Sequence, residues 1–276
     1  MPMARRVVAV ALLCLLLPPV LRAQSIDTRS ASNNINYAFS SELGSGVYEL
    51  DGRIMQVYRL PLWWNLRDAT DEKPGLRFVM PTTFGFFDFT SRDVLEGDLP
   101  SNIGSFSIMP GLELDYLAPR GWHFVPYLLA GTSLADNADD GWLFSGGARL
   151  QRTSQRGVRQ TIRLHEFSAS MVDYRGATPN DWFVRQRNGF EIRRVNPVAP
   201  GVHRWVAGAY AILDLVPDPP HMQNDAEAGV VQFEAGLTLA LNPMPQLFGY
   251  DLPRLGIGYR LAGDFPGWRL VIGAPF

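Results

Sequence analysis

Cysteine, lysine and long apolar segments are nearly absent from this chain of 276 residues. The one cysteine, Cys14, lies in a segment that we expect to be removed, so the rest of the chain can form neither a disulfide nor a thiolate metal site. After Arg22, no stretch of about 18 residues is free of both charges and turn-forming residues, which excludes a helical membrane span. Lys73 is the only lysine. The arginine bias reflects either genome composition or the suitability of guanidinium groups for ion-pair networks.

The charge balance is slightly acidic, with 27 acidic against 25 basic residues. Removal of an N-terminal signal that contains arginine increases this acidic excess, which argues against a nucleic-acid partner. Hydrophobic residues make up 46% of the chain, and the mean hydropathy is close to zero. This balance is too polar for a helical membrane protein and typical of a barrel with a lipid-facing wall and a polar interior.

The first 23 residues have the three parts of a secretory signal peptide. Arg5 and Arg6 form a basic start, an apolar run covers 7–17, and Ala23 offers a small residue for cleavage. The apolar run is shorter than the roughly 20 residues that a membrane-spanning helix needs. We therefore expect residues 1–23 to be a signal peptide and residues 24–276 to form one domain.

Segments with one apolar and one polar face recur along this domain, as expected for strands. We expect strands at 33–43, 53–66, 75–89, 104–117, 121–134, 141–152, 157–172, 181–195, 202–215, 229–241, 253–262 and 267–276. An even number is typical of single-chain bacterial barrels. The sequence thus predicts an all-β fold, a transmembrane antiparallel up-and-down β-barrel of about 12 strands. Longer loops, the first at 44–52, would face outward from the cell.

Tryptophan residues lie near the ends of several expected strands. They are Trp63, Trp64, Trp122, Trp142, Trp182 and Trp268. Tryptophan at both membrane–water boundaries forms the aromatic girdle of membrane barrels. Their placement favours lipid over water as the surroundings of the outer wall.

The segment 267–276 ends on an aromatic residue without a polar tail. Trp268, Leu270, Ile272 and Phe276 fall on one side of an extended strand, because side chains alternate with period two. This ending resembles the C-terminal signature of bacterial outer-membrane barrels. The resemblance implies a location in a Gram-negative outer membrane, and it implies that these four residues are an assembly signal for the barrel-assembly machinery.

The stretches 43–48 and 85–89 resemble the solitary autotransporter-like outer-membrane barrels. The resemblance extends over nearly the whole mature chain and implies the same architecture. Only Gln24 to Ser32 precede the first expected strand, too few residues for a passenger or a lumen helix. We expect a barrel without a passenger, in contact with outer-membrane lipid and lipopolysaccharide.

The polar faces of the expected strands predict a lumen lined by arginine and acidic side chains. The candidates are Arg53, Arg59, Arg77, Glu113, Asp115, Arg149, Arg163, Arg185, Arg187, Glu191, Arg193, Glu234, Arg260 and Arg269. An ion-pair network that holds the barrel in shape is one interpretation, since buried charges must be paired. A water-filled channel or porin that favours anions is the alternative. Both predict a structural or transport-related role.

A lipid-modifying hydrolase is a third hypothesis, because some outer-membrane barrels carry a serine and a histidine on the outer wall. The nearest candidates are His165, Glu166, Ser168 and Ser170. A nucleophile and its base must touch. On a strand His165 and Ser168 point to opposite faces, so we expect no catalytic residues.

An acidic loop and several glycine pairs could suggest a bound ion. Asp136, Asp139 and Asp140 could hold a hard cation through oxygen ligands. A solvated loop is the commoner explanation, and no glycine pair opens a helix after a buried strand, as a phosphate-binding loop requires. We expect no metal and no cofactor.

Overall fold

The structure is a computed structural model, which describes most of the chain after residue 43. The described residues are 44–50, 53–87, 104–135, 139–176, 180–195, 203–217, 228–243, 246–247, 250–251, 254–263 and 267–276. The predicted signal peptide at 1–23 and the predicted strand at 33–43 lie outside these ranges. Within them, no helix is long and apolar enough to cross a membrane.

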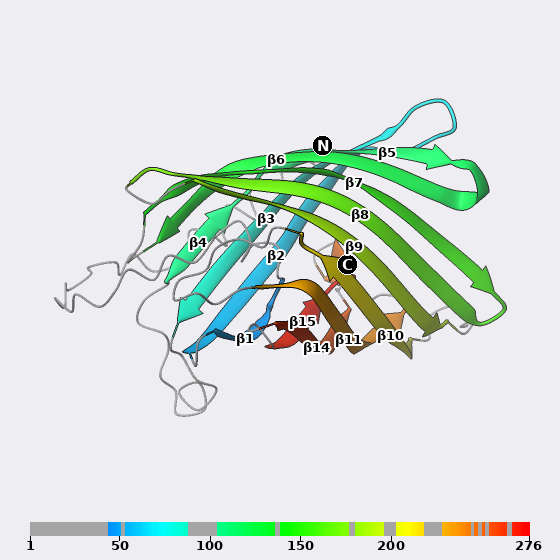
Figure 1. Cartoon of the computed structure of the whole chain (residues 1–276). Coiled ribbons are helices and arrows are strands. Elements are labelled where there is room, and N and C mark those ends of the chain that lie inside the picture. Colours follow the sequence, from blue (N-terminus) through cyan, green and yellow to red (C-terminus); the bar gives the residue numbers. More distant parts are fainter. Residues whose placement is uncertain are drawn as a thin grey trace. The chain divides into compact units, whose positions relative to one another are not determined.

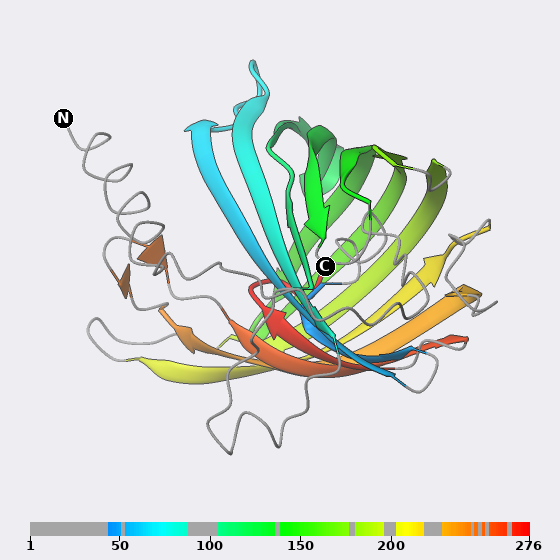
Figure 2. The same ribbon diagram turned by 90° about the vertical axis from the view of Figure 1, so that its left-hand side faces the viewer.

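The strands form one closed antiparallel barrel with twelve staves, the strand positions around its wall, in up-and-down order (Figures 1 and 2). This confirms the predicted all-β, antiparallel up-and-down barrel of about 12 strands. They are β1 (Gly46–Leu50), β2 (Arg53–Arg67), β3 (Gly75–Phe87), β4 (Ser105–Ile108), β5 (Gly111–Ala118), β6 (Trp122–Ala135), β7 (Gly141–Arg156), β8 (Arg159–Tyr174), β9 (Asp181–Arg194), β10 (Arg204–Leu215), β11 (Ala228–Asn242), β14 (Leu255–Gly263) and β15 (Gly267–Ile272). β4 and β5 follow one another along a single stave between β3 and β6.

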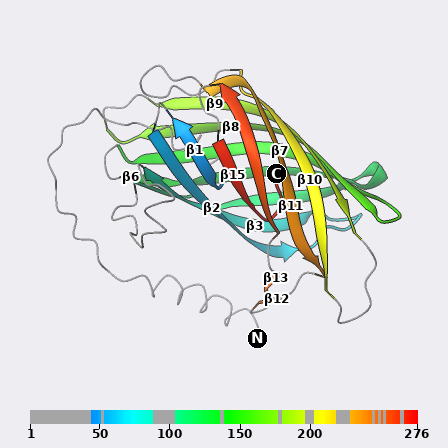
Figure 3. The same cartoon turned by 90° about the horizontal axis from the view of Figure 1, so that it is seen from below.

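The barrel closes through β1, which pairs with β2 on one side and with β15 on the other (Figure 3). The predicted loop at 44–52 is therefore wrong over most of its length. Gly44, at a φ of 85°, turns the chain into the strand, and the backbone N–H of Leu270 donates to the carbonyl oxygen of Ser45 at 2.9 Å. Backbone pairing of this kind is independent of side chains, so a glycine-rich segment can still form a stave.

Side chains alternate between an exposed outer wall and a buried inner wall. On β10, Val206, Tyr210, Ile212 and Asp214 are buried, while the intervening Leu213 is exposed. The same alternation separates exposed Leu and Phe from buried Glu and Gln on β11. The predicted apolar and polar rows thus correspond to the outer and inner walls on most staves.

β8 faces the opposite way from the prediction. Ile162 and Leu164 are buried inside, whereas Arg163 and His165 are exposed on the outer wall. β8 pairs with β7 without a register shift, so its side chains alternate regularly along the whole strand. Phe167 points outward, and every second residue from it, including Arg163 and His165, therefore points outward too. Periodicity separates two rows of side chains, but only pairing with neighbours decides which row faces out.

β15 ends at Ile272, and the last four residues turn into the lumen. Gly273, at a φ of 96°, makes this turn, and its N–H donates to the carbonyl oxygen of Arg254 at 2.8 Å. Trp268 and Leu270 are exposed on the outer wall as predicted. The prediction that Phe276 continues their row is wrong, because Phe276 packs inside against Tyr210 and its neighbours.

The two ends of the barrel differ in their connections. At one end, which we call the short-turn end, β5 and β6 are joined by the 3-10 turn η1 (Pro119–Gly121), and β7 and β8 by Gly157 and Val158. The connection after β11, also at this end, holds a small hairpin of β12 (Gln246–Leu247) and β13 (Tyr250–Asp251). The opposite end has longer connections, after β3 and after β10.

Tryptophan side chains mark both ends of the outer wall. By strand parity, Trp142, Trp182 and Trp268 lie outward near the long-loop end, and Trp64, Trp122 and Trp205 lie outward near the short-turn end. Trp63 departs from the predicted girdle: it faces inward, with the guanidinium carbon of Arg77 at 5.3 Å from its ring centre.

Candidate functional site

The inner wall carries charged side chains from β2 to β15. Of the predicted lumen residues, those placed on the inner wall are Arg59, Arg77, Glu113, Asp115, Arg149, Arg185, Arg187, Glu191, Arg193, Glu234, Arg260 and Arg269. Arg163 is a correction, because the parity of β8 places it on the outer wall. The side chain of Arg53 lies outside the described part of the structure.

Six residues from β9 to β15 form what we call the buried arc. They are Arg187, Tyr210, Asp214, Glu234, Arg260 and Arg269, all of them buried. Its first pair joins β9 to β10: Nε and Nη2 of Arg187 donate to the two carboxylate oxygens of Asp214, both at 2.8 Å. This two-point geometry is the strongest form of an arginine–carboxylate contact.

Glu234 is the centre of the buried arc, with donors from three strands. Arg260 Nε donates to Oε2 at 3.1 Å, Arg269 Nη1 donates to Oε1 at 2.9 Å, and the Tyr210 hydroxyl donates to Oε1 at 2.8 Å. A second guanidinium nitrogen of Arg260 lies 3.5 Å from Asp214. The two carboxylates and three guanidinium groups therefore form one connected network between β9 and β15.

Two glycines make room for Tyr210 to reach Glu234. A Cβ atom at Gly236 would lie 2.7 Å from Cε1 of Tyr210, and a Cβ atom at Gly258 would overlap the tyrosine hydroxyl. Gly236 and Gly258 stand opposite one another on β11 and β14. The tyrosine thus crosses the inner wall where only hydrogen atoms project.

The C-terminal tail, Gly273–Phe276, covers the buried arc. Arg269 Nη2 donates to the carbonyl oxygen of Pro275 at 2.7 Å, which fixes the tail inside the lumen. Phe276 packs against the apolar cluster of Tyr210, Ile212 and Val271. It lies over Gly189 of β9, where a Cβ atom would come within 2.8 Å of the phenylalanine ring.

Glu191 is a separate buried carboxylate near the short-turn end. Arg254 Nη1 donates to its Oε1 at 2.5 Å, and the hydroxyl of Thr238 donates to the same oxygen at 3.2 Å. Arg254 immediately precedes β14, so this pair links β9 to the start of β14.

Five residues on β3 to β8 form what we call the water-accessible arc: Arg77, Glu113, Tyr127, Arg149 and Glu166. Glu113 accepts from Arg77 Nη1 at 3.2 Å and from Arg149 Nη2. The side chain of Arg77 is 41% exposed and that of Arg149 is 26% exposed. Solvent therefore reaches both guanidinium groups, although Glu113 itself is buried.

The two arcs meet on β9. Arg149 lies over the ring of Tyr127, with its guanidinium carbon at 5.3 Å from the ring centre, and the Tyr127 hydroxyl donates to Glu166 at 2.6 Å. The other oxygen of Glu166 lies 3.8 Å from Arg185 Nη2. Arg185 and Arg187 are neighbouring inward positions of β9, so the two arcs lie next to each other on this strand.

A pair of one histidine and one aspartate lies on β5 and β6, two of the strands that carry the water-accessible arc. His123 Nδ1 is 2.9 Å from Oδ1 of Asp115, and both side chains are partly exposed. The predicted lumen residue Asp115 thus has a partner on the neighbouring strand β6.

Several members of the network were missed from the sequence. Asp214 lies on β10, where both rows are rich in small and apolar residues, so its inward position was obscured. Trp205 and Leu213 both point outward, and counting in steps of two from them would have placed Asp214 on the inner wall. Tyr127 and Tyr210 gave no signal, because a tyrosine fits either wall. Glu166 was missed as a lumen residue because the two faces of β8 were predicted the wrong way round.

The hydrolase candidates lie on two walls. His165 is exposed outside, where its Nδ1 is 2.8 Å from Oδ1 of Asn188, while Ser168 is fully buried inside. Ser170 donates to the hydroxyl of Ser145 at 2.9 Å, inside the barrel. The predicted separation of His165 from Ser168 is confirmed.

Of the acidic loop considered for a cation, Asp136 lies outside the described residues. Asp140 Oδ1 accepts from the backbone N–H of Ala135 at 3.2 Å, an ordinary loop contact. Among the described residues, no three His, Cys, Asp or Glu side chains gather as metal ligands would.

Comparison with known proteins gives no match. No family model matches the chain, and a search of curated proteins finds no match. What stands is the architecture itself: a closed twelve-stave antiparallel β-barrel, the kind of structure that bacterial outer-membrane proteins use, with a connected polar network on its inner wall.

Proposed function

We propose that this protein is an integral barrel of a Gram-negative outer membrane whose lumen is closed by its own side chains, with a structural role. The observation that carries this proposal is the contrast between the walls. Leucine, phenylalanine and tryptophan side chains are exposed outside, while paired arginine and carboxylate groups are buried inside. Only a closed barrel or a helix satisfies every backbone group in lipid.

The outer wall supports contact with lipid. Its apolar side chains, such as Leu128, Phe167 and Leu237, are exposed on the outward face of their strands. In water, so large an exposed apolar surface would favour association. Outward tryptophans near both ends correspond to the two boundaries of a membrane.

The inner wall supports a closed lumen. Arg260 and Glu234 have side-chain exposures of 2% and 1%, so a water molecule can scarcely touch either group. A network this dry resists hydrated ions, since opening it would separate buried charges from their partners. This favours the structural role over a permanently open pore.

A second candidate, an anion-favouring channel or porin, is supported by the water-accessible arc. Arg77 and Arg149 present guanidinium groups to solvent from within the lumen. An arginine-lined path lowers the barrier for anions. A conducting state would need the buried arc and the tail to move aside.

Two measurements test the proposal. The refolded protein should insert into phosphatidylcholine vesicles and float with them, and a product that stays dissolved and compact without detergent would overturn the membrane assignment. In planar bilayers the wild type should be silent, with detergent alone as the control. Stepwise currents with anion selectivity from the wild type would overturn the closed lumen and favour the channel.

The finer aspects of the assignment are proposals as well. We infer a passenger-free barrel of the autotransporter-like kind, which the barrel-assembly machinery inserts among outer-membrane lipid and lipopolysaccharide. A lipid hydrolase is the third hypothesis. Deacylation of phospholipid by the refolded barrel, lost in His165→Ala, would favour it over a structural role.

A further inference from the structure

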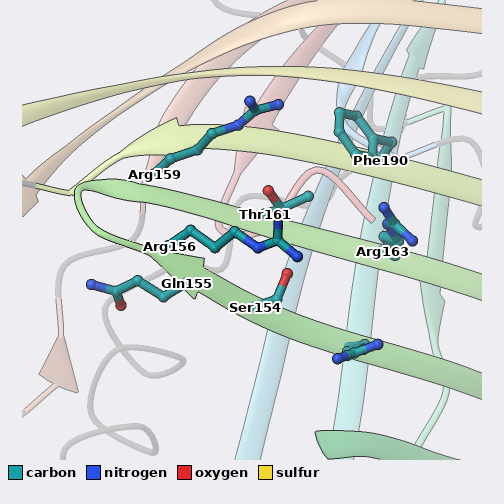
Figure 4. Close-up of a pocket in the computed structure, with 8 residues that line it drawn as sticks. Ser154, Gln155, Arg156, Arg159, Thr161, Arg163 and Phe190 are labelled. Carbon is teal, nitrogen blue, oxygen red and sulfur yellow. The ribbon is translucent and has the colours of Figure 1, made fainter. Parts of the chain in front are cut away.

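A groove on the outer wall, at the short-turn end, is lined by arginines. It has a volume of about 510 Å³, and side chains from β7, β8 and β9 line it (Figure 4). The residues that matter here are Arg152, Arg156, Arg159, Thr161, Arg163 and Phe190. Arg156, Arg159 and Arg163 are exposed, on a wall that is otherwise mainly apolar.

The arginines of this groove face one another across the β7–β8 pair. Arg152 stands directly opposite Arg163, and Arg156 stands directly opposite Arg159. Like charges at directly opposed positions destabilise a sheet. Two such pairs in one hairpin indicate that something other than the protein balances the charge.

Acidic side chains do not supply that balance within the described part of the chain. By strand parity, the outward positions of β6 to β9 include one acid, Asp173, at the opposite end of β8. The described carboxylates that form ion pairs have other partners, and most of them lie inside the lumen. An external anion is therefore the group that fits the groove.

The height of the groove on the barrel points to the membrane surface. Arg152 lies ten positions after the outward Trp142 on β7. With about 3.4 Å per residue and a strand tilt of about 40°, these residues are separated by about 26 Å along the barrel axis. The apolar band of membrane barrels is about 25 Å tall. Arg152 and Arg163 would therefore lie at the headgroup level when Trp142 lies at the other boundary.

The residues beside the groove are of the kinds expected at the headgroup level of a membrane. The guanidinium carbon of Arg152 is 5.9 Å from the ring centre of Trp122, and that ring is 6.0 Å from the ring of His165. Trp122 and Arg152 stand opposite one another, and an indole with an arginine beside it at the boundary is the arrangement that interfacial anchors adopt. Arg156 and Arg159 extend past this row toward the aqueous side.

We propose that this groove binds the phosphate-bearing headgroup of an anionic phospholipid. Guanidinium groups match phosphate oxygens with two-point contacts, the Thr161 hydroxyl can donate to a further oxygen, and Phe190 offers an apolar contact for the start of an acyl chain. Short turns face the periplasm in membrane barrels, which places the groove in the phospholipid leaflet. The proposal rests on the membrane placement proposed above.

The test compares two variants that each lose two positive charges. Arg156→Gln with Arg163→Gln removes one guanidinium from each facing pair. Arg120→Gln with Arg204→Gln is the matched control, since both are exposed residues beside the same end and neither lines the groove. The folded barrel in neutral detergent is titrated with short-chain phosphatidylglycerol and followed by native mass spectrometry. We expect about 30-fold weaker binding for the groove variant, from two lost phosphate contacts, and less than threefold for the control.

The sign of the effect on stability provides a second readout. In phosphatidylcholine vesicles the groove variant should resist urea at least as well as the wild type, because like-charge repulsion is relieved. In vesicles that also contain phosphatidylglycerol, the wild type should gain resistance and the groove variant should gain little. Equal gains for the wild type and both variants would overturn the proposal.

Two further outcomes separate the possible failures. If inorganic phosphate stabilises the wild type as much as the lipid does at equal concentration, the groove is a general anion site and the lipid assignment is overturned. If the wild type enters neither kind of vesicle, the proposed membrane placement fails, and this proposal fails with it. Normal insertion with equal lipid responses overturns the lipid site alone.

Discussion

The two arcs of the inner wall use the same chemistry in different surroundings. In each, arginines from two other strands hold a buried glutamate, with Glu234 in the buried arc and Glu113 in the water-accessible arc. The difference lies in the arginines. Arg260 is 2% exposed, while Arg77 is 41% exposed. Arginines of identical charge therefore meet water on one side of the lumen and almost none on the other.

The cause of this difference is what covers each arc. The tail places Pro275 and Phe276 over the buried arc, and Gly236 and Gly258 let Tyr210 fill the space beside Glu234. Arg77 is only partly covered: the inward ring of Trp63 lies beside its guanidinium group, and Trp63 is itself 54% exposed. A buried arginine that loses its carboxylate has no water to replace it, whereas an exposed one does.

The strongest test of the comparison is Glu234→Gln. The change leaves two buried guanidinium groups, those of Arg260 and Arg269, without the carboxylate that accepts from both. We expect a loss of about 3–5 kcal/mol in the free energy of unfolding, as for other broken buried ion pairs. Urea unfolding of the barrel in phosphatidylcholine vesicles, followed by tryptophan fluorescence, measures it.

The control is Glu72→Gln, which neutralises an exposed carboxylate in the connection between β2 and β3. It should change the free energy of unfolding by no more than about 0.5 kcal/mol. A Glu234→Gln barrel as stable as this control would show that water enters the buried arc freely. The distinction between the two arcs would then be lost.

A smaller effect is expected for Phe276→Ala, which removes the apolar cover. Phe276 is partly buried, so the loss should be about 2 kcal/mol, below the 3–5 kcal/mol of a fully buried phenylalanine. Amide hydrogen exchange should become faster on β9 and β10, which Phe276 covers, and stay unchanged on β6 and β7. Ala274→Ser, at an exposed position of the same tail, is the control. Unchanged exchange on β10 would mean that the tail does not keep the arc dry.

From β2 to β15 the sequence predicted the strands of the wall well, and it predicted their outward faces nearly as well, whereas β1 was taken for a loop. In β11, Val231 and Phe233 alternate with the polar Gln232 and Glu234, and a closed barrel allows such an apolar row only one outward side. On β8, the apolar Ile162 and Leu164 were predicted to face lipid but lie inside the barrel, because an apolar pair can fill a lumen as readily as it can face lipid. Pairing with β7 settles that choice, and pairing is not written in the period of one strand.

The network was predicted as a set of charges, but its division into two arcs was not. Which arginine is dry depends on the turn at Gly273 and on where Tyr210 lies, and both are long-range properties of the closed barrel. Phe276 shows the limit most clearly. Its alternation with Trp268 predicts an outward side chain, yet one glycine at positive φ reverses the chain and takes the ring inside.

The smallest expected effect, Glu113→Gln, sharpens the comparison most. Arg77 can be hydrated when its partner is neutralised, so we expect a loss of about 1 kcal/mol. That loss should shrink as salt is raised from about 0.1 M to 1 M, because screening reaches exposed pairs. The loss in Glu234→Gln should hardly respond to salt, since buried pairs are little screened. Equal losses and equal salt responses in the two variants would mean that exposure of the arginine does not decide the strength of these pairs. A small, salt-sensitive loss beside a large, salt-insensitive one would show that one polar network serves two purposes, fixing the barrel on one side and leaving charge available to water on the other.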